Sequence, residues 1–291
     1  MSPFLSAVSG LLLWLSALTL IAGVTIIGPR RLYDVPRNLV HYLQEAKRYV
    51  AVLVAVMFVS AVGRAPLQTV SELIGLRLTG YIYAFEGGFV GWVQTFATAE
   101  LTLYFSWMYV YGYAFLLVFP FIAYAALSTS TTLKRLMLAY ALNYGLGLVM
   151  YTLVLAYGPR NVMPDLVTPL LYTFNPEYRA LTGEVNVPTN VFPSLHTSLS
   201  VTVAAFAALT YDEYRAWAPI AAWIAGSVVV ATMYLGIHWA VDVVAGIALA
   251  LGSVYLSYRI VDDAGESTAG PTNGPTDGST DPSSDAGRTD D

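Results

Sequence analysis

Residues 217–260 read WAPIAAWIAGSVVVATMYLGIHWAVDVVAGIALALGSVYLSYRI. The two apolar runs in this segment, 217–237 and 239–260, are each long enough for a helix to cross the roughly 30 Å hydrocarbon core of a bilayer. His238 stands between the runs, and Asp242 follows it by one helical turn. The segment therefore predicts two membrane-spanning helices with a pair of titratable side chains where they meet.

Similar apolar runs occupy most of the 291 residues, of which 56% are hydrophobic and 11% are charged. A soluble domain carries roughly 25% charged residues, so water is not the main solvent of this chain. The predicted spans lie at about residues 3–28, 49–67, 101–127, 136–157, 194–211, 217–237 and 239–260. The expected fold class is an all-α, polytopic transmembrane helical bundle with about seven spans.

Basic residues indicate the orientation of the bundle, because Lys and Arg collect in cytoplasmic segments of membrane proteins. Counting crossings from the basic segment after the first span places nine of them on the cytoplasmic side: Arg30, Arg31, Arg37, Lys47, Arg48, Lys134, Arg135, Arg215 and Arg259. The other side receives Arg64, Arg77, Arg160 and Arg179. We therefore expect a cell-membrane protein with a cytoplasmic tail and with the polar segment 158–193 on the extracytoplasmic side.

The chain divides into three predicted parts. Residues 1–48 form an N-terminal transmembrane helix and a basic cytoplasmic loop, residues 49–260 form a membrane-embedded domain, and residues 261–291 form an acidic tail. The tail has almost no apolar residues to bury, which predicts disorder. The absence of cysteine excludes disulfides and thiolate chemistry, and no basic stripe interleaved with aromatics supports a nucleic-acid partner.

His238 and Asp242 form the first candidate functional pair. Ionisable groups at membrane depth are expensive, so they indicate a functional site with a partner. In a helix Asp242 lies on the same face as His238, where its carboxylate can hold one ring nitrogen and leave the other free to attack. Gly246 shares this face and permits close approach of another helix. The alternative is a polar clamp between helices.

His196 is predicted to emerge on the same membrane face, at the start of the 194–211 span. In Pro193-Ser194-Leu195-His196, the proline suits a first helical turn and Ser194 can supply a capping hydroxyl. Such a helix start can bind a phosphate, and His196 can protonate a departing alkoxide. The alternative is a capping motif with an interfacial histidine. His41, the third histidine, is expected to be a solvated loop residue.

The stretch Pro193-Ser194-Leu195-His196, followed by His238-x-x-x-Asp242 at the start of the final span, resembles the second and third signature motifs of the type 2 phosphatidic acid phosphatase superfamily. More narrowly, it resembles the branch that contains inositol phosphorylceramide and sphingomyelin synthases, because leucine replaces the glycine of the phosphatase motif. The resemblance covers about residues 101–260 and implies a six-helix phosphatase-like core.

The resemblance also implies a mechanism without metal ion or cofactor. His238 would be the nucleophile that forms a phosphohistidine, Asp242 its orienting base, and His196 the acid that protonates the leaving group. The protein would then be an enzyme of lipid metabolism, either a hydrolase of a membrane lipid phosphate ester or an inositolphosphotransferase-like transferase that uses an alcohol acceptor such as inositol.

Two departures from the family pattern concern phosphate binding. The first motif, a lysine followed seven residues later by arginine-proline, is absent, since Lys134 has Ala141 at that spacing. The arginine expected six residues before the nucleophile is Thr232. Candidate substrate-binding residues are therefore Arg160, which is a partial substitute but also suits an interfacial anchor, together with Ser194 and Tyr234.

Two further functions stay open. The missing cations favour a noncatalytic membrane scaffold or a lipid or anion transporter that keeps the helix arrangement. A metal-dependent hydrolase would use His196, His238 and Asp242 as ligands. The motifs explain the same three residues better, and no His-x-x-x-His pattern is present, so no metal is expected.

Overall fold

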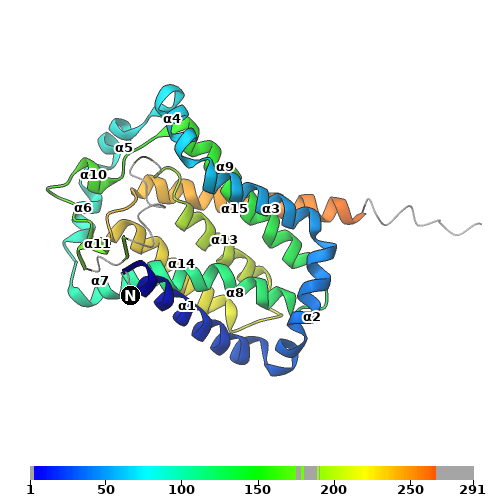
Figure 1. Ribbon diagram of the computed structural model, residues 1–291. Helices are drawn as coiled ribbons and strands as arrows, with labels where there is room; N and C mark the ends of the chain where they lie inside the picture. The colour runs from blue at the N-terminus through cyan, green and yellow to red at the C-terminus, as the bar shows by residue number, and fades with distance from the viewer. Residues whose placement is uncertain (1–2, 175–177, 180–188, 190, 267–291) are drawn as a thin grey trace, which may run out of the picture.

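The structure, a computed structural model, describes residues 3–174, 178–179, 189 and 191–266. It is an all-α bundle with one short pair of parallel strands, β1 (Leu76–Arg77) and β2 (Val154–Leu155) (Figure 1). The helices are α1 (Pro3–Ala22), η1 (Gly23–Ile27), α2 (Pro29–Glu45), α3 (Lys47–Val62), α4 (Arg64–Ile74), α5 (Thr79–Glu86), α6 (Phe89–Gln94), α7 (Ala99–Trp107), η2 (Met108–Gly112), α8 (Tyr113–Ala125), α9 (Thr131–Leu153), α10 (Pro159–Val162), α11 (Leu170–Phe174), α13 (Leu195–Leu209), α14 (Trp217–Tyr234) and α15 (Ala240–Glu266).

Five helical segments in the described part of the chain are long and apolar enough to cross a membrane: Phe4–Ile27, Ala99–Ala125, Thr131–Leu153, Trp217–Tyr234 and Ala240–Ala264. A sixth candidate is the pair α3–α4, which bends by 75°. The predicted span at 194–211 is the shorter apolar helix α13. The polytopic all-α bundle is thus confirmed, with five or six spans of full length where the sequence predicted about seven.

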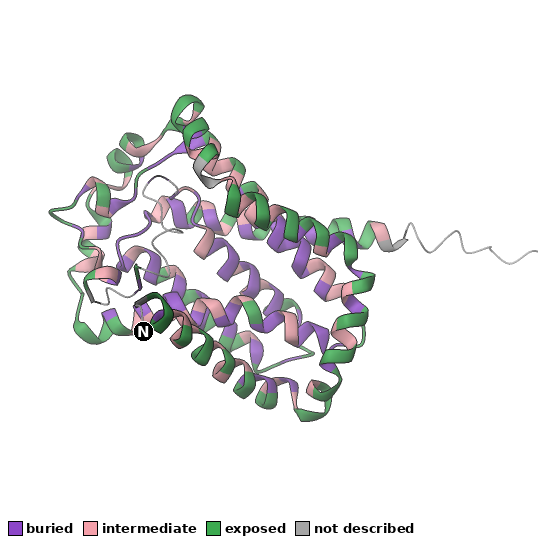
Figure 2. Cartoon of the chain, viewed as in Figure 1, coloured by how far each residue is buried: buried purple, intermediate pink, exposed green. Residues whose placement is uncertain are grey.

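Helix α13 lies at the centre of the bundle. It packs against α14, α15, α9 and α8, while α1 covers α8 and α3 covers α9 from outside (Figure 1). Figure 2 shows that α13 is largely buried and that the outer side of α1 is exposed. Because neighbouring helices bury most of α13, this short helix needs less contact with lipid than the full-length spans do.

Buried polar groups join α9 to α13. The amide of Asn143 donates to the hydroxyl of Thr202 at 3.1 Å and accepts a hydrogen bond from Ser198. All three side chains are fully buried. Such groups need partners in an apolar interior, so this network fixes how the two helices face each other.

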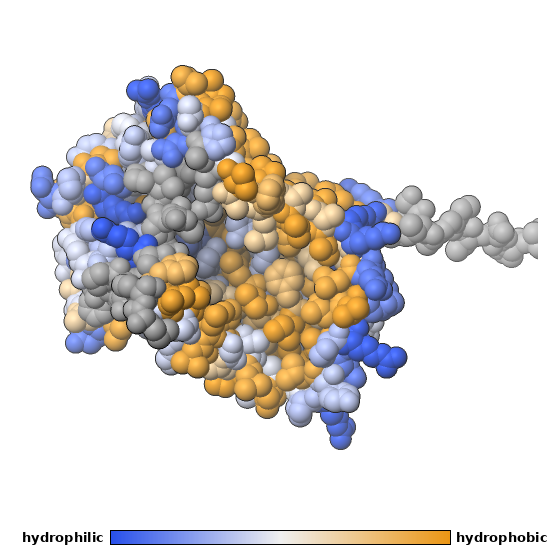
Figure 3. Space-filling view, viewed as in Figure 1, coloured by the Kyte–Doolittle hydropathy of each residue, from blue (hydrophilic) through white to orange (hydrophobic). Residues whose placement is uncertain are grey.

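The outer surface is apolar where lipid would contact it. Leu13 on α1 and Phe58 on α3 are 70% and 66% exposed. Figure 3 shows a broad apolar face that ends in hydrophilic residues near α2 and the C-terminal end of α15. A contiguous apolar surface of this size is rare on soluble monomers. The chain is therefore a membrane protein.

The segment predicted as a basic cytoplasmic loop is instead helical. Pro29 occupies the first turn of α2, where its missing N–H costs nothing, and the helix continues through Pro36 to Glu45. The hydroxyl of Tyr42 donates to the Leu127 carbonyl at 3.0 Å, which ties α2 to the end of α8. His41 is exposed on this helix, with Nε2 3.0 Å from a Glu45 oxygen.

The last helix is longer than predicted. Residues 261–266, assigned from sequence to the tail, continue α15. Arg135 on α9 supports this extension, because its Nε donates to Asp262 at 3.1 Å and its guanidinium lies 4.1 Å from the Tyr258 ring centre. The remainder of the predicted disordered tail, 267–291, lies outside the described residues.

Helices α13 and α15 approach each other closely at Gly246. A Cβ atom at this position would lie 2.5 Å from the carbonyl oxygen of Ser194 and 3.1 Å from the Cβ of Thr197. Backbone cannot move aside as a flexible side chain can. Glycine is therefore required for this crossing, as the sequence suggested.

Gly246→Ala should consequently force α13 and α15 apart and lower the free energy of unfolding by about 1–3 kcal/mol, the usual cost of overpacking. Gly252→Ala is the matched control, since it lies on the same helix and a Cβ there meets no atom within 4 Å. The thermal midpoints of both variants in one detergent measure the difference. Equal midpoints would contradict the close crossing.

Candidate active site

The starts of α13 and α15 meet at one end of the bundle, and both candidate motifs lie there. The Ser194 N–H donates to the carbonyl oxygen of Asp242 at 3.0 Å, which joins the two helix starts directly. Residues distant in sequence, His196 and the His238–Asp242 pair, are thereby held in one region.

His238 lies between α14 and α15, as the predicted runs placed it, so it does not share a helix with Asp242 as the argument for their pairing assumed. It precedes α15, and Asp242 occupies the first turn. The carboxylate reaches back to accept the Trp239 N–H at 2.8 Å, and the same oxygen, Oδ2, lies 3.4 Å from His238 Nδ1. The separation of Nδ1 and Oδ2 is within ion-pair distance, but the two atoms are not aligned for a hydrogen bond. Because both side chains are buried, at 4% and 0% exposure, their interaction is weakly screened.

A tight turn after α14 positions His238. Gly236 has φ +73°, a conformation that favours glycine, and a Cβ there would lie 2.7 Å from a Val167 methyl carbon. The N–H of His238 donates to the Thr232 carbonyl at 3.0 Å, while the Thr232 hydroxyl donates to the Val229 carbonyl at 2.7 Å. Thr232, at the position where the family resemblance expects arginine, therefore supports the turn and brings no charge.

Arg160, the candidate cation, is attached to this turn through its backbone. Its backbone N–H lies 3.4 Å from the Gly236 carbonyl oxygen, two residues before His238. Its guanidinium lies 5.2 Å from the Tyr172 ring centre, and Nη1 is buried without a hydrogen-bond partner among the described residues. A buried donor of a cation without a partner is costly, so this position fits an anionic ligand.

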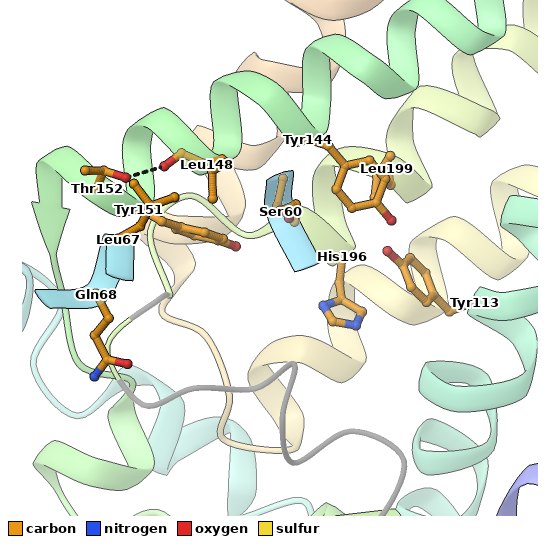
Figure 4. Close-up of a pocket in the computed structure, with 11 residues that line it drawn as sticks. Ser60, Leu67, Gln68, Tyr113, Tyr144, Leu148, Tyr151, Thr152, His196 and Leu199 are labelled. Atoms are coloured by element: carbon orange, nitrogen blue, oxygen red, sulfur yellow. Dashed lines mark hydrogen bonds between the residues drawn. The ribbon is translucent and has the colours of Figure 1, made fainter. Parts of the chain in front are cut away.

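His196 occupies the first turn of α13, which Ser194 caps by accepting the Thr197 N–H at 3.3 Å. Pro193 lies one residue before this cap, outside the first turn where the sequence placed it. His196 also lines a cavity of about 280 Å³. Figure 4 shows Tyr113 and Tyr144 with their hydroxyl groups turned toward the space beside the imidazole.

Two predicted substrate-binding residues make structural contacts. The Ser194 hydroxyl is the helix cap just described, and Ser194 is fully buried. The Tyr234 hydroxyl lies 2.9 Å from the Thr102 hydroxyl on α7, and its ring lies 4.8 Å from the Phe105 ring. The roles of Ser194 and Tyr234 in binding a substrate stay predictions.

The sequence interpretation missed Glu86. From α5, its two carboxylate oxygens accept the N–H groups of Ala240 and Val241 at 2.8 Å and 3.1 Å, the first two residues of α15. Burial raises the pKa of this carboxyl above its ordinary value, against the two N–H groups, which lower it. The sequence feature that could have indicated a role for Glu86 is its position as a single acidic residue in an apolar, aromatic segment.

The metal-dependent alternative requires at least three ligand side chains around one point. Among the described residues, no group of three or more His, Cys, Asp or Glu side chains is arranged to hold a metal ion. His196, His238 and Asp242 therefore do not form the three-ligand set that this alternative requires.

A protein-family model matches the chain. The family model described as PAP2 superfamily matches residues 84–256, more than half of the chain. The match begins two residues before Glu86 and ends within α15, so α1 to α4 lie outside it. No curated protein and no solved structure matches the chain.

Replacing Glu86 by alanine should leave the N–H groups of Ala240 and Val241 without acceptors. Each buried unsatisfied donor costs about 1–3 kcal/mol, so the thermal midpoint should fall. Glu72→Ala, at an exposed site on α4, should leave the midpoint unchanged. A Glu86 variant as stable as the Glu72 variant would show that the cap contributes nothing.

Proposed function

The chain belongs to the PAP2 superfamily, and on this basis we propose that it is an integral-membrane phosphatase or phosphotransferase that acts on lipid phosphate esters through a phosphohistidine at His238. The observation that carries the proposal is the buried His238–Asp242 pair, 3.4 Å apart. Arg160, whose backbone N–H bonds to the same turn at Gly236, adds a buried Nη1 without a partner among the described residues. A nucleophile, its orienting carboxylate and a cation for phosphate oxygens are the groups that this reaction needs.

In the first half-reaction, Nε2 of His238 attacks phosphorus. A P–N bond forms while the ester P–O bond breaks, and the electron pair leaves with the lipid oxygen. His196 protonates that oxygen. Asp242 stabilises the positive charge on the His238 ring, as carboxylates do for catalytic imidazoles, and Arg160 attracts the phosphoryl oxygens.

In the second half-reaction, His196 takes a proton from water or an alcohol. The oxygen of that acceptor attacks phosphorus, the P–N bond breaks, and its electron pair returns to His238. Water gives hydrolysis, and an alcohol such as inositol gives the transfer that the resemblance to inositol phosphorylceramide and sphingomyelin synthases implies. An assay of purified protein on one labelled lipid distinguishes the two reactions. Hydrolysis releases phosphate, whereas transfer exchanges the headgroup.

The cavity beside His196 supports access from the membrane. Its walls come from α3, α4, α8, α9 and α13, with apolar Leu67, Leu148 and Leu199 among polar side chains. The apolar face in Figure 3 is hollowed between α1 and α3, so a lipid can approach α13 sideways. By the distribution of Lys and Arg, we place this site at the extracytoplasmic face and the C-terminal end of α15 in the cytoplasm.

One observation favours the noncatalytic alternative, a scaffold or a lipid or anion transporter. Thr232 brings no charge to the position where family catalysis uses arginine, and its hydroxyl is already bonded within α14. Arg160 must then bind the phosphate alone among the candidate cations, which makes it the decisive residue for this alternative.

His238→Ala should abolish conversion of a phosphate-labelled lipid, because no nucleophile remains. In the unaltered protein, rapid quenching in alkali should trap label on protein, and acid should release it, as expected for a phosphohistidine. His41→Ala, at an exposed histidine on α2, is the control and should retain activity. Full lipid conversion by the His238 variant would refute the covalent mechanism.

Arg160→Gln should weaken binding of the phosphate ester, since one charged hydrogen bond contributes about 1.5–3 kcal/mol, or roughly 10- to 150-fold in kcat/KM. Arg77→Gln, at an exposed strand residue, is the matched control. Steady-state kinetics on both variants provide the comparison. If kcat/KM were the same for both variants, Arg160 would be an interfacial anchor and the transporter alternative would gain.

A further inference from the structure

The span between Ala99 and Ala125 is interrupted by a π-helical turn, η2. Such turns are rare and often occur at functional sites, because the extra residue in the turn redirects the side chains around it. Two of the redirected side chains are Tyr109, within the turn, and Tyr113, directly after it. Both face His196.

The two tyrosine rings lie against the imidazole of His196. Each ring centre is 4.5 Å from the imidazole centre, with interplanar angles of 21° for Tyr109 and 38° for Tyr113. The Tyr109 hydroxyl lies 3.4 Å from Nδ1 of His196. Tyr109 is only 1% exposed, so its ring cannot move away without repacking the helices. The imidazole is therefore fixed in orientation.

The two histidines are held by different means. His238 has a carboxylate 3.4 Å away, whereas no ion pair joins His196 to a carboxylate in the part of the chain that the structure describes. Aromatic faces attract cations by about 0.5–2 kcal/mol each, which offsets part of the cost of charging the partly buried imidazole of His196. With Nδ1 beside Tyr109, Nε2 is the nitrogen left to exchange a proton with a ligand in the cavity.

We propose that Tyr109 and Tyr113 are positioning residues that hold His196 as the proton donor to the departing oxygen. This inference rests on the proposed function. The η2 turn is the structural feature that brings both rings onto one imidazole, because it changes the direction of the side chains between α7 and α8. Ordinary aromatic packing in a membrane bundle is the competing explanation, and it predicts no dependence on the leaving group.

Proton donation matters most when the leaving oxygen is strongly basic. Two synthetic substrates separate this effect from packing: a long-chain alkyl phosphate, whose alkoxide needs a proton, and a nitrophenyl phosphate with a similar alkyl chain, whose phenolate departs without one. The full-length protein in vesicles is assayed on both. His196→Ala should lose about 100-fold or more on the alkyl ester, the usual range for a general acid, and far less on the nitrophenyl ester.

Tyr109→Leu removes both the ring and the hydroxyl, and it should reproduce the selective loss of His196→Ala at about 10-fold or more. Tyr109→Phe keeps the ring and should give a smaller loss with the same selectivity. The matched control is Tyr111→Phe, in the same π-helical turn, because the Tyr111 ring contacts Trp14, Trp107 and Tyr178. It should treat both esters as the unaltered protein does.

The outcomes are distinguishable. Equal losses on the two esters for Tyr109→Leu, beside a selective loss for His196→Ala, would overturn the positioning role and leave the proposed function standing. No selectivity for His196→Ala would overturn the acid role itself, and with it the proposed mechanism. If Tyr109→Leu does not fold, Tyr109→Phe decides the question, since it preserves the ring and nearly the whole side-chain volume.

Discussion

The crossing of α13 and α15 at their first turns is the constraint on which the site depends. Gly246 lets the Ser194 carbonyl approach the α15 backbone, and the Ser194 N–H bonds to the Asp242 carbonyl at 3.0 Å. Asp242 thus contributes its carbonyl to one helix start and its carboxylate to Trp239 and His238. One residue couples the packing of two helices to the orientation of the proposed nucleophile.

The start of α15 is closed to ligands by carboxylates of the protein itself. Asp242 accepts the N–H of Trp239, and Glu86 accepts those of Ala240 and Val241. A helix start is ordinarily a good phosphate site because its N–H groups are free. Here they are used to rigidify the segment that carries His238, so attraction for phosphate must come from other groups. Arg160 is a candidate, because its Nη1 is buried without a partner among the described residues.

Much of the bundle could be predicted from apolar run lengths, because a bilayer imposes a minimum length on each spanning helix. The runs at 217–237 and 239–260 became α14 and α15 nearly as expected. Three predictions failed where tertiary contacts override local signals. The segment after the first span is the helix α2, anchored by Tyr42, and α15 runs past residue 260, held by Arg135. His238 and Asp242 do not share one helical face, because the turn at Gly236 keeps His238 outside α15.

The amino-acid sequence by itself determined the membrane as solvent, the all-α class and the presence of two histidines and one aspartate in recognisable motifs, since these follow from hydropathy and short-range spacing. Only the tertiary structure decided which groups surround those three residues. Glu86 reaches α15 across 154 positions, and Tyr109 reaches His196 across 87. Contacts over such separations depend on how the helices pack, which spacing along one chain does not encode.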